Sequence, residues 1–406
     1  IKISAKSSAV DGWSIEGHTH TAYFCAGGGG GSFDPNTDTI GTITPVNTPI
    51  ASNDSVNVAF NKTQGQFDNQ ASNIAVLNSN STKRYGRFSN KFIVAMGSRF
   101  GLHSNLSDGV ETTATSRIAY KFIGKTSQIT LYFCNIDPIA TFNTPLISDD
   151  ITIEASIEYP AGTFNRVTFN NGQTSFLLKK GFAIESDVIK SYIPSGVTVW
   201  VRTNVLVTVG QKWLKNQITY SAVNVLGNEG VIAGANYVTS GTITNSTTNC
   251  FGPTAILGVS STNYASVLQI GDSRTVGSGD SGQPSYGYQR SGGLYNRSFA
   301  DIYPSLSLNV AGQKSIYWDK SASKAANYMD DLLSCCQFGI ENLGINDLDL
   351  LLTLQLNKMS LWYYAKSRGV KMFCTTIEPK TTSTDGWVTL INQKVTASES
   401  VRIGIN

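Results

Sequence analysis

Histidine is almost absent from this sequence of 406 residues, which has three: His18, His20 and His103. Charged residues are also scarce, at 15% of the chain against about a quarter in an ordinary globular protein. The net charge is only +3 and no run of lysine or arginine occurs, which argues against nucleic acid as a partner. No stretch approaches the roughly 18 consecutive apolar residues of a membrane span, so no membrane insertion is expected.

The six cysteines show neither C-x-x-C spacing nor the density of a disulfide framework. We expect buried free thiols, with Cys134 and Cys374 in strand-like runs and Cys335 and Cys336 at the end of a helix. Free thiols indicate assembly in a reducing cytoplasm, also for a protein that later works outside cells. The chain is instead rich in Ser, Thr, Asn and Gly, a composition typical of β-rich extracellular or virion proteins.

Three regions differ in their sequence pattern, which predicts a multi-domain chain. Residues 1–60 contain five consecutive glycines and a Thr/Pro/Asn-rich stretch, which indicates an extended connector or attachment region. Residues 61–262 form short strand-like runs separated by turn signals, which predicts an antiparallel β-sandwich, jelly-roll-like. Over residues 263–406 strand and helix patterns alternate, which predicts a parallel sheet with helices on both faces.

Three helices are expected in the third region. The first covers Ser321–Cys336 with Ser321 as N-cap, and the second covers Leu348–Arg368 and ends at Gly369. A third, amphipathic helix is expected over Asp385–Ile405 with Asp385 as N-cap. The apolar residues of the second helix are expected to be core: Leu351, Leu352, Leu354, Leu356, Leu361 and Trp362.

Three polar or glycine residues follow successive apolar strands of this region. Ser273 ends a Gly-Asp-Ser turn after the run 265–270, a position where α/β enzymes place nucleophiles. Gly312 follows the run 305–308, and Asn346 follows the run 338–343.

The order and spacing of these blocks resembles the SGNH (GDSL-type) hydrolase family over about residues 264–406. The resemblance implies a small α/β/α domain with Ser273 as nucleophile and Gly312 and Asn346 in the oxyanion hole. It implies ester hydrolysis without a cofactor. It also implies a base, because in that family a histidine lies three residues after an aspartate near the C-terminus of the domain.

This sequence departs from the family because no histidine follows Gly271. A serine hydroxyl without a base is a poor nucleophile. Three explanations compete. The Asp-His pair lies beyond Asn406, since the pattern ends before a further strand and closing helix and the domain is incomplete at its C-terminus. Alternatively the domain is an inactive enzyme kept for binding, or a histidine from the N-terminal region or another subunit completes the site.

Two further groups of residues are candidates for binding. His18 and His20 lie two apart on an extended segment that resembles the G-H-x-H motif of trimeric phage tail fibres, which implies a structural metal ion in a homotrimer. The alternative is an exposed polar strand. In the glycine-rich loop after Ser273, Tyr286 and Tyr288 suit stacking on sugar rings, and Arg274 suits contact with an anionic sugar, against ordinary loop packing as the alternative.

Together these features predict a serine esterase that removes O-acetyl or similar ester groups from a bacterial surface polysaccharide. We expect it in a virion or outside cells, as part of a phage tail fibre or spike, beside other virion proteins. One alternative is a non-catalytic receptor-binding or structural virion protein that retains an SGNH scaffold. The other is a secreted bacterial carbohydrate esterase.

Overall fold

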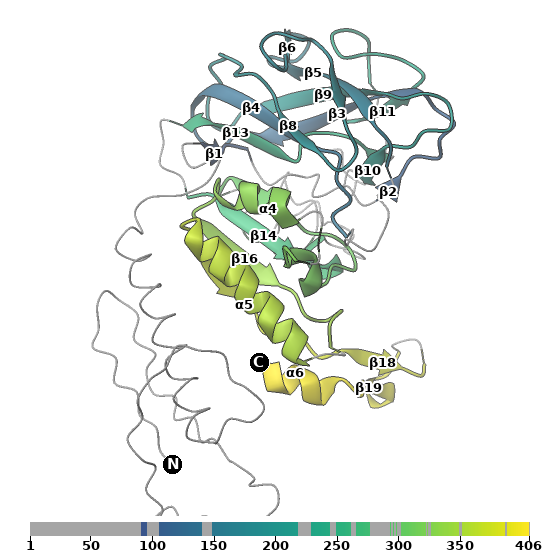
Figure 1. Ribbon diagram of the computed structural model, residues 1–406, viewed down its shortest axis with the longest axis vertical. Coiled ribbons are helices and arrows are strands. Elements are labelled where there is room, and N and C mark those ends of the chain that lie inside the picture. The colour runs from purple at the N-terminus through teal and green to yellow at the C-terminus, as the bar shows by residue number, and fades with distance from the viewer. Residues whose placement is uncertain are drawn as a thin grey trace, which may run out of the picture. The chain divides into compact units, whose positions relative to one another are not determined.

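The computed structural model of the chain describes two kinds of architecture in succession (Figure 1). The described residues are 91–95, 105–139, 148–217, 229–243, 249–260, 265–276, 302–321, 326–348, 351–385 and 388–405, with single residues between these ranges. The expected connector over residues 1–60, with His18 and His20, lies outside them, as do Tyr286 and Tyr288. Among the described helices, none has the length and apolar composition that crossing a bilayer requires.

The first part is built of antiparallel strands, as the sequence predicts. One sheet has the order β1-β13-β4-β8, another β11-β3-β9-β5-β6 with β7 also on β5, and a third β12-β10-β2. Their hydrophobic side chains form one buried cluster to which the two larger sheets both contribute, so they pack as a sandwich. The strands are β1 (Phe92–Ile93), β2 (Asn105–Leu106), β3 (Thr113–Lys121), β4 (Thr126–Cys134), β5 (Ile151–Glu158), β6 (Phe164–Arg166), β7 (Phe176–Leu178), β8 (Ala183–Glu185), β9 (Thr198–Leu206), β10 (Leu214–Gln217), β11 (Gly230–Ala233), β12 (Asn249–Cys250) and β13 (Ala255–Ser260).

Alternation of side chains explains why these segments form strands with one face in the core. In β5, Ile151, Ile153 and Ile157 are fully buried in the cluster, whereas Thr152 and Glu154 between them are only partly buried. A period of two places successive side chains on opposite faces of a strand, so the pattern fixes which face turns inward.

The second part begins after β13 and is a parallel sheet. Its strands are β14 (Val267–Gly271), β15 (Ser305–Ser307), β16 (Phe338–Asn342) and β17 (Lys371–Cys374), in the order β15-β14-β16-β17. The helical elements between them are α2 (Ser273–Val276), the 3-10 helix η3 (Ser315–Trp318), α4 (Ala326–Leu333) and α5 (Leu351–Ser367). α5 contacts β17. Because all four strands run parallel, their carboxyl ends meet at one edge of the sheet.

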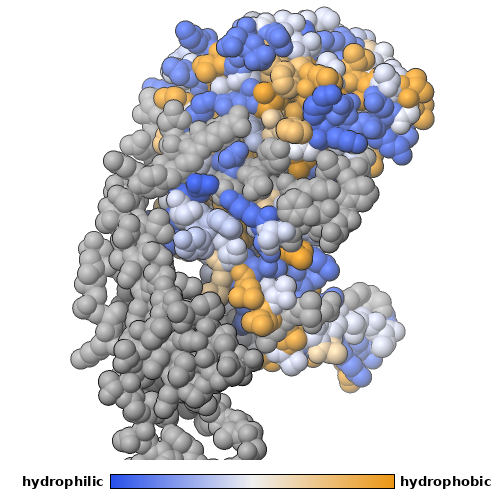
Figure 2. All heavy atoms as spheres, in the orientation of Figure 1, coloured by the Kyte–Doolittle hydropathy of each residue, from blue (hydrophilic) through white to orange (hydrophobic). Residues whose placement is uncertain are grey.

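The second expected helix is confirmed as α5, and Gly369 has a φ of +82° after its end. Two of its leucines were wrongly expected in the core, because Leu352 and Leu356 are 67% and 57% exposed while Leu354 and Leu361 are buried. Figure 2 shows hydrophobic residues at the surface in this region. The first expected helix is shorter than predicted: it begins at Ala326, and the Ser321 hydroxyl donates to Asp319 Oδ1 (2.8 Å).

The helix expected over Asp385–Ile405 is confirmed only for its last residues, Glu399–Ile405, and is wrong for the part before them. The segment instead contributes β19 (Gln393–Val395), paired antiparallel with β18 (Thr381–Ser383), followed by the short helix α6 (Glu399–Ile405); the 3-10 turn η4 (Leu390–Asn392) precedes β19. Asp385 does cap backbone N–H groups, those of Val388 (3.2 Å) and Thr389 (2.9 Å), but it caps a turn. Side-chain bonds of this kind offer the backbone an alternative to a helix.

The two architectures share a hydrophobic core. Tyr132 of β4 and Leu257 of β13 lie in the same buried cluster as Leu268 of β14 and Met329 of α4. The Ser305 N–H at the start of β15 also donates to the Ala95 carbonyl (3.2 Å). One face of the four-stranded sheet of the sandwich is thus part of the core of the α/β region.

Of the expected free cysteines, four are buried: Cys134, Cys250, Cys335 and Cys336. Cys374 at the end of β17 is exposed instead. It lies on a strand that pairs only with β16 among the described strands, so one side of its backbone has no neighbouring strand there to cover it.

A charged triad lies on the face of the larger sheet that points away from the sandwich core. Glu158 accepts from Arg117 Nε (2.7 Å) and Nη2 (2.8 Å) and from Arg202 Nε (2.9 Å), and all three side chains are at most 5% exposed. Burial alone would raise the pKa of Glu158, but the bonds from Arg117 and the Gly162 N–H and the two guanidinium charges outweigh it and lower the pKa to about 2.

We expect Glu158→Gln to lower the free energy of unfolding by about 3–5 kcal/mol at pH 7, because it leaves two buried guanidinium groups without their carboxylate. The pKa of Glu158 lies below its ordinary value of 4.5 in the folded protein, so its charge stabilises the fold fully above that value and progressively less toward pH 2. Urea unfolding of both proteins between pH 7 and pH 2 checks this. A difference in stability that stays constant over this range would contradict the assignment.

Candidate functional site

Three of the residues singled out from the sequence lie beyond the carboxyl ends of three adjacent strands. Ser273 is two residues after β14, Gly312 follows β15, and Asn346 follows β16. β14 is the middle strand of the three, with Gln269 opposite Ser307 of β15 and opposite Ile340 of β16. Parallel pairing in this register brings the three loops to the same edge of the sheet.

The turn that carries Ser273 is tight. The Asp272 carbonyl accepts from the Thr275 N–H (3.1 Å), the Thr275 hydroxyl (2.8 Å) and the Val276 N–H (3.0 Å). Thr275 packs so closely that a Cβ on Gly271 would lie 2.4 Å from its hydroxyl oxygen, so only glycine fits at the end of β14. Ser273 is partly exposed, whereas Asp272 before it is fully buried.

Gly312 lies on a loop that is fastened to β14. The Val310 N–H donates to the Gly271 carbonyl (3.1 Å), and the Gln313 N–H donates to the Val310 carbonyl (3.0 Å). Gly312 has a φ of +76°, in the left-handed region, and a Cβ there would meet no atom within 4 Å. Conformation, rather than space, therefore requires glycine at this position.

Asn346 is held by the same loop. Its Nδ2 donates to the Gln313 carbonyl (3.0 Å), which uses one of its two amide hydrogens and leaves the other for a ligand. The amide of the buried Gln313 side chain lies between the Gly271 carbonyl and Trp318 Nε1. Its nitrogen is assigned to the side of Gly271 from these neighbours, so that it donates to that carbonyl (2.7 Å) and its oxygen accepts from Trp318 Nε1 (3.2 Å). Gln313 thus links the turn of Ser273, the loop of Gly312 and Asn346.

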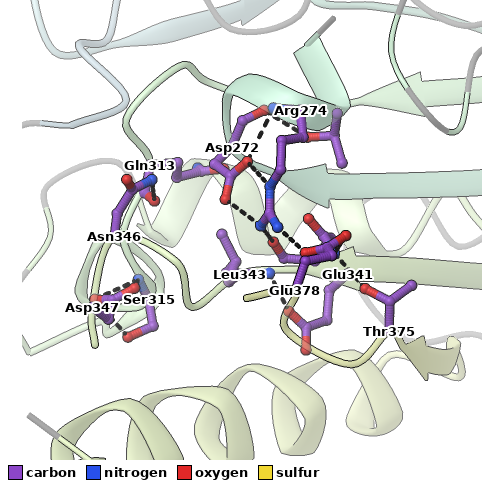
Figure 3. A network of polar contacts seen from close by, with 12 residues as sticks. Asp272, Arg274, Gln313, Ser315, Glu341, Leu343, Asn346, Asp347, Thr375 and Glu378 are labelled. Carbon is purple, nitrogen blue, oxygen red and sulfur yellow. Dashed lines mark hydrogen bonds and ion pairs between the residues drawn. The ribbon is translucent and has the colours of Figure 1, made fainter. Parts of the chain in front are cut away.

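Asp347 fastens the next part of this loop. Its carboxylate accepts from the Ser315 N–H (3.0 Å) and the Ser315 hydroxyl (3.2 Å), as Figure 3 shows. Burial raises the pKa of Asp347, while the bonds from Ser315 act in the opposite direction. A structural role for this residue, holding the loop of Asn346, agrees with these contacts.

Arg274 is engaged on several sides. Its Nε and Nη2 donate to the two oxygens of Asp272 (3.0 and 2.8 Å), Nη2 also donates to the Asn342 carbonyl (3.3 Å), and Nη1 pairs with Glu378 (Figure 3). Asp272 Oδ1 accepts the Arg274 backbone N–H as well (3.0 Å). Glu378 comes from the loop after β17 and is about half exposed, at 48%.

The sequence pointed to Ser273, Gly312 and Asn346 but not to Gln313, Ser315 or Glu378. Gln313 directly follows Gly312, and its position in that loop is the signal that could have found it. Glu378 is 104 residues from Arg274 along the chain, so no local pattern connects them. Among the described residues, no three His, Cys, Asp or Glu side chains gather as a metal site.

Comparisons with known proteins give only distant likenesses. No model of a known protein family matches the chain, and no curated protein matches it. Similar solved structures include the protein YxiM of Bacillus subtilis, at 12% identity and a TM-score of 0.28, covering 80% of this chain and 75% of that one. A family two carbohydrate esterase from Clostridium thermocellum is similar at 12% identity and a TM-score of 0.23, covering 73% of this chain and 80% of that one. A family two carbohydrate esterase from Cellvibrio japonicus is similar at 12% identity and a TM-score of 0.22, covering 77% of this chain and 84% of that one. Similarity this low carries no argument about activity.

We expect Gly312→Ala to lower the free energy of unfolding by about 1–2 kcal/mol, the cost of an L-residue in the left-handed region. Gly210→Ala is the matched control, because Gly210 has a φ of +87° and also has no atom within 4 Å of a Cβ. Denaturant unfolding of the two variants should give similar losses. A much larger loss for Gly312→Ala would contradict the open space above this residue.

Proposed function

We propose that this chain is a serine ester hydrolase of the SGNH type that acts on an acylated carbohydrate. The observation that carries the proposal is the arrangement at the carboxyl edge of the parallel sheet. There a serine on a tight turn, a glycine in a left-handed loop and a half-buried asparagine are fastened to one another through Gln313. These are a nucleophile and two hydrogen-bond donors, supplied by three neighbouring strands.

The proposed reaction proceeds through an acyl-enzyme. Ser273 Oγ attacks the ester carbonyl, its proton passes to a base, and the carbonyl oxygen becomes negative. The N–H groups of Ser273 and Gly312 and the free amide hydrogen of Asn346 stabilise that oxygen. The C–O bond to the sugar then breaks, the sugar oxygen takes the proton, and water hydrolyses the acyl-serine to release the acid.

The base is not among the carboxylates seen near the serine. Asp272 and Glu378 both pair with Arg274, so their carboxylate oxygens already accept its N–H groups. Asp347 is committed to Ser315. We therefore keep histidine as the proposed base, from a part of the protein outside the described residues.

The substrate and the setting extend this proposal. We propose O-acetyl groups of a bacterial surface polysaccharide as the substrate, with the loop of Tyr286 and Tyr288 as a sugar contact. A homotrimeric, virion-associated protein with a metal ion at His18 and His20 is the proposed assembly, and a secreted esterase is the alternative setting. These parts are inferred from the sequence.

We expect the intact protein to hydrolyse 4-nitrophenyl acetate and to release acetate from an O-acetylated polysaccharide. Ser273→Ala should lower kcat by about 10⁴-fold or more, because the nucleophile is lost. Equal rates in both proteins would exclude Ser273 as nucleophile. An intact protein that binds the polysaccharide but hydrolyses neither ester would support the non-catalytic binding protein instead.

Asn346→Asp should lower kcat about 100- to 1,000-fold with little change in KM, because a carboxylate of similar volume repels the oxyanion. The control is Asn170→Asp in an exposed turn of the sandwich, which should leave kcat unchanged. Steady-state kinetics on 4-nitrophenyl acetate measures both. A kcat of Asn346→Asp equal to that of the control would show that Asn346 is not an oxyanion donor.

A further inference from the structure

Arg274 directly follows the proposed nucleophile, and its side chain spans three separate parts of the chain. It contacts Asp272 in the turn after β14, the Asn342 carbonyl at the end of β16, and Glu378 in the loop after β17. Figure 3 shows the guanidinium between Asp272 and Glu378. The loop after β17 is further connected to β16, because Asn342 Nδ2 donates to the Thr375 hydroxyl.

The donors of Arg274 are largely used by these contacts. A guanidinium has five N–H groups. The Nε hydrogen and one Nη2 hydrogen go to the Asp272 carboxylate, the other Nη2 hydrogen goes to Asn342, and one Nη1 hydrogen goes to Glu378. Only one Nη1 hydrogen remains for a ligand.

The local charge also opposes the binding of an anion. One positive guanidinium faces two carboxylates, those of Asp272 and Glu378, so the sum of the three charges is negative. At comparable distances the two carboxylates repel a negatively charged sugar more than the one guanidinium attracts it. The expectation that Arg274 contacts an anionic substrate therefore finds no support in its surroundings.

The pairing of Arg274 with Asp272 matters for the turn of Ser273 because of the position of Asp272. Its side chain is fully buried, and a buried carboxylate without a partner is strongly destabilising. The same carboxylate accepts the backbone N–H of Arg274, so its position determines the backbone on the C-terminal side of Ser273. The guanidinium thereby couples the conformation of this turn to β16 and to the loop after β17.

We propose that Arg274 is a positioning residue: with Asp272 and Glu378 it holds the turn of Ser273 in register with β16 and the loop after β17, and it does not bind the substrate. The proposal rests on the proposed esterase function for its kinetic consequences. The coupling between the turn of Ser273 and the loop after β17 follows from the contacts alone, and it is measured separately.

The test compares Arg274→Lys with the intact wild-type protein on two esters, neutral 4-nitrophenyl acetate and a 4-nitrophenyl ester that carries a carboxylate. Lysine keeps the charge but cannot make the bidentate pair with Asp272. We expect kcat to fall about 100-fold by the same factor on both esters, with KM unchanged, as for a displaced catalytic group. A rise in KM confined to the charged ester, or no kinetic change, would overturn the proposal.

The variant Glu378→Gln tests the pairing of Arg274 with Glu378 separately from its pairing with Asp272. Glutamine retains an oxygen that accepts from Nη1, so we expect a smaller fall in kcat, about 10-fold or less, again equal on both esters. The control is Arg166→Lys in the sandwich, since Arg166 pairs with Glu154 (2.6 Å) and is 32% exposed, against 30% for Arg274. It should leave kcat unchanged, and an equal loss of kcat in this control would overturn the proposal.

Hydrogen exchange judges the coupling independently of catalysis. In Arg274→Lys we expect roughly tenfold faster amide exchange in both segments 271–276 and 375–380, but not in β5. If the wild-type protein hydrolyses neither ester, the proposed function fails, and the exchange alone then decides whether the coupling exists. Unchanged exchange in segment 375–380 would overturn the coupling, whatever the activity.

Discussion

The backbone pairing of β14 with β15 on one side and β16 on the other is the constraint on which the candidate site depends. Ser273, Gly312 and Asn346 each lie a few residues beyond one of these strands, so the register of the sheet sets their relative positions. A slip of one residue would reverse every side chain of β14 and carry the serine turn away from the asparagine loop. The core residues Leu268 and Ile270 oppose such a slip, because both are fully buried.

Polar contacts then convert this register into a fixed arrangement of groups. Gln313 connects the Gly271 carbonyl to the loop of Asn346, and Asp347 fastens that loop to Ser315. Donors held in place before a substrate arrives stabilise a developing charge without reorganisation, which is the physical basis of an oxyanion hole. The contacts of Arg274 also hold the site in place before a substrate arrives, since they join its side chain to other groups of the protein.

The sandwich contributes to the α/β region directly. A parallel sheet of four strands is small, and its apolar surface must be buried against another layer of the structure. Residues of β4 and β13 join its buried cluster, so part of the core of the candidate site region comes from the preceding domain.

The outer face of the larger sheet carries the buried triad of Glu158, Arg117 and Arg202, where Arg202 also donates to backbone carbonyls of residues 237, 240 and 241. Arg202 thus connects the triad to the backbone of the loop that contains these residues.

How much could be predicted from the sequence differs between local and distant features. The strand alternation, the helix α5 with its closing glycine and the change to a parallel sheet are local patterns, and they were readable because side-chain periodicity follows backbone geometry. The three loop residues at the edge of that sheet were found from their place after successive apolar runs and from the family resemblance. The end of the chain misled the same reasoning: Asp385 looks like a helix cap, but its side chain binds Thr389 and Asn392 in a turn, and Leu390 and Ile391 are over 80% exposed. Leu352 and Leu356 are of a residue type that is usually buried, yet both are exposed and no described element covers them.

The sequence by itself determined which residues follow each strand and which faces turn inward. Only the tertiary structure decided what those residues touch: that Asp272 and Glu378, 106 positions apart, share one guanidinium, and that Gln313 joins Gly271 to Asn346. The physical reason is that hydrogen bonds and ion pairs between loops depend on distances that parallel strand pairing sets across the sheet, and these distances leave no periodic trace in the chain.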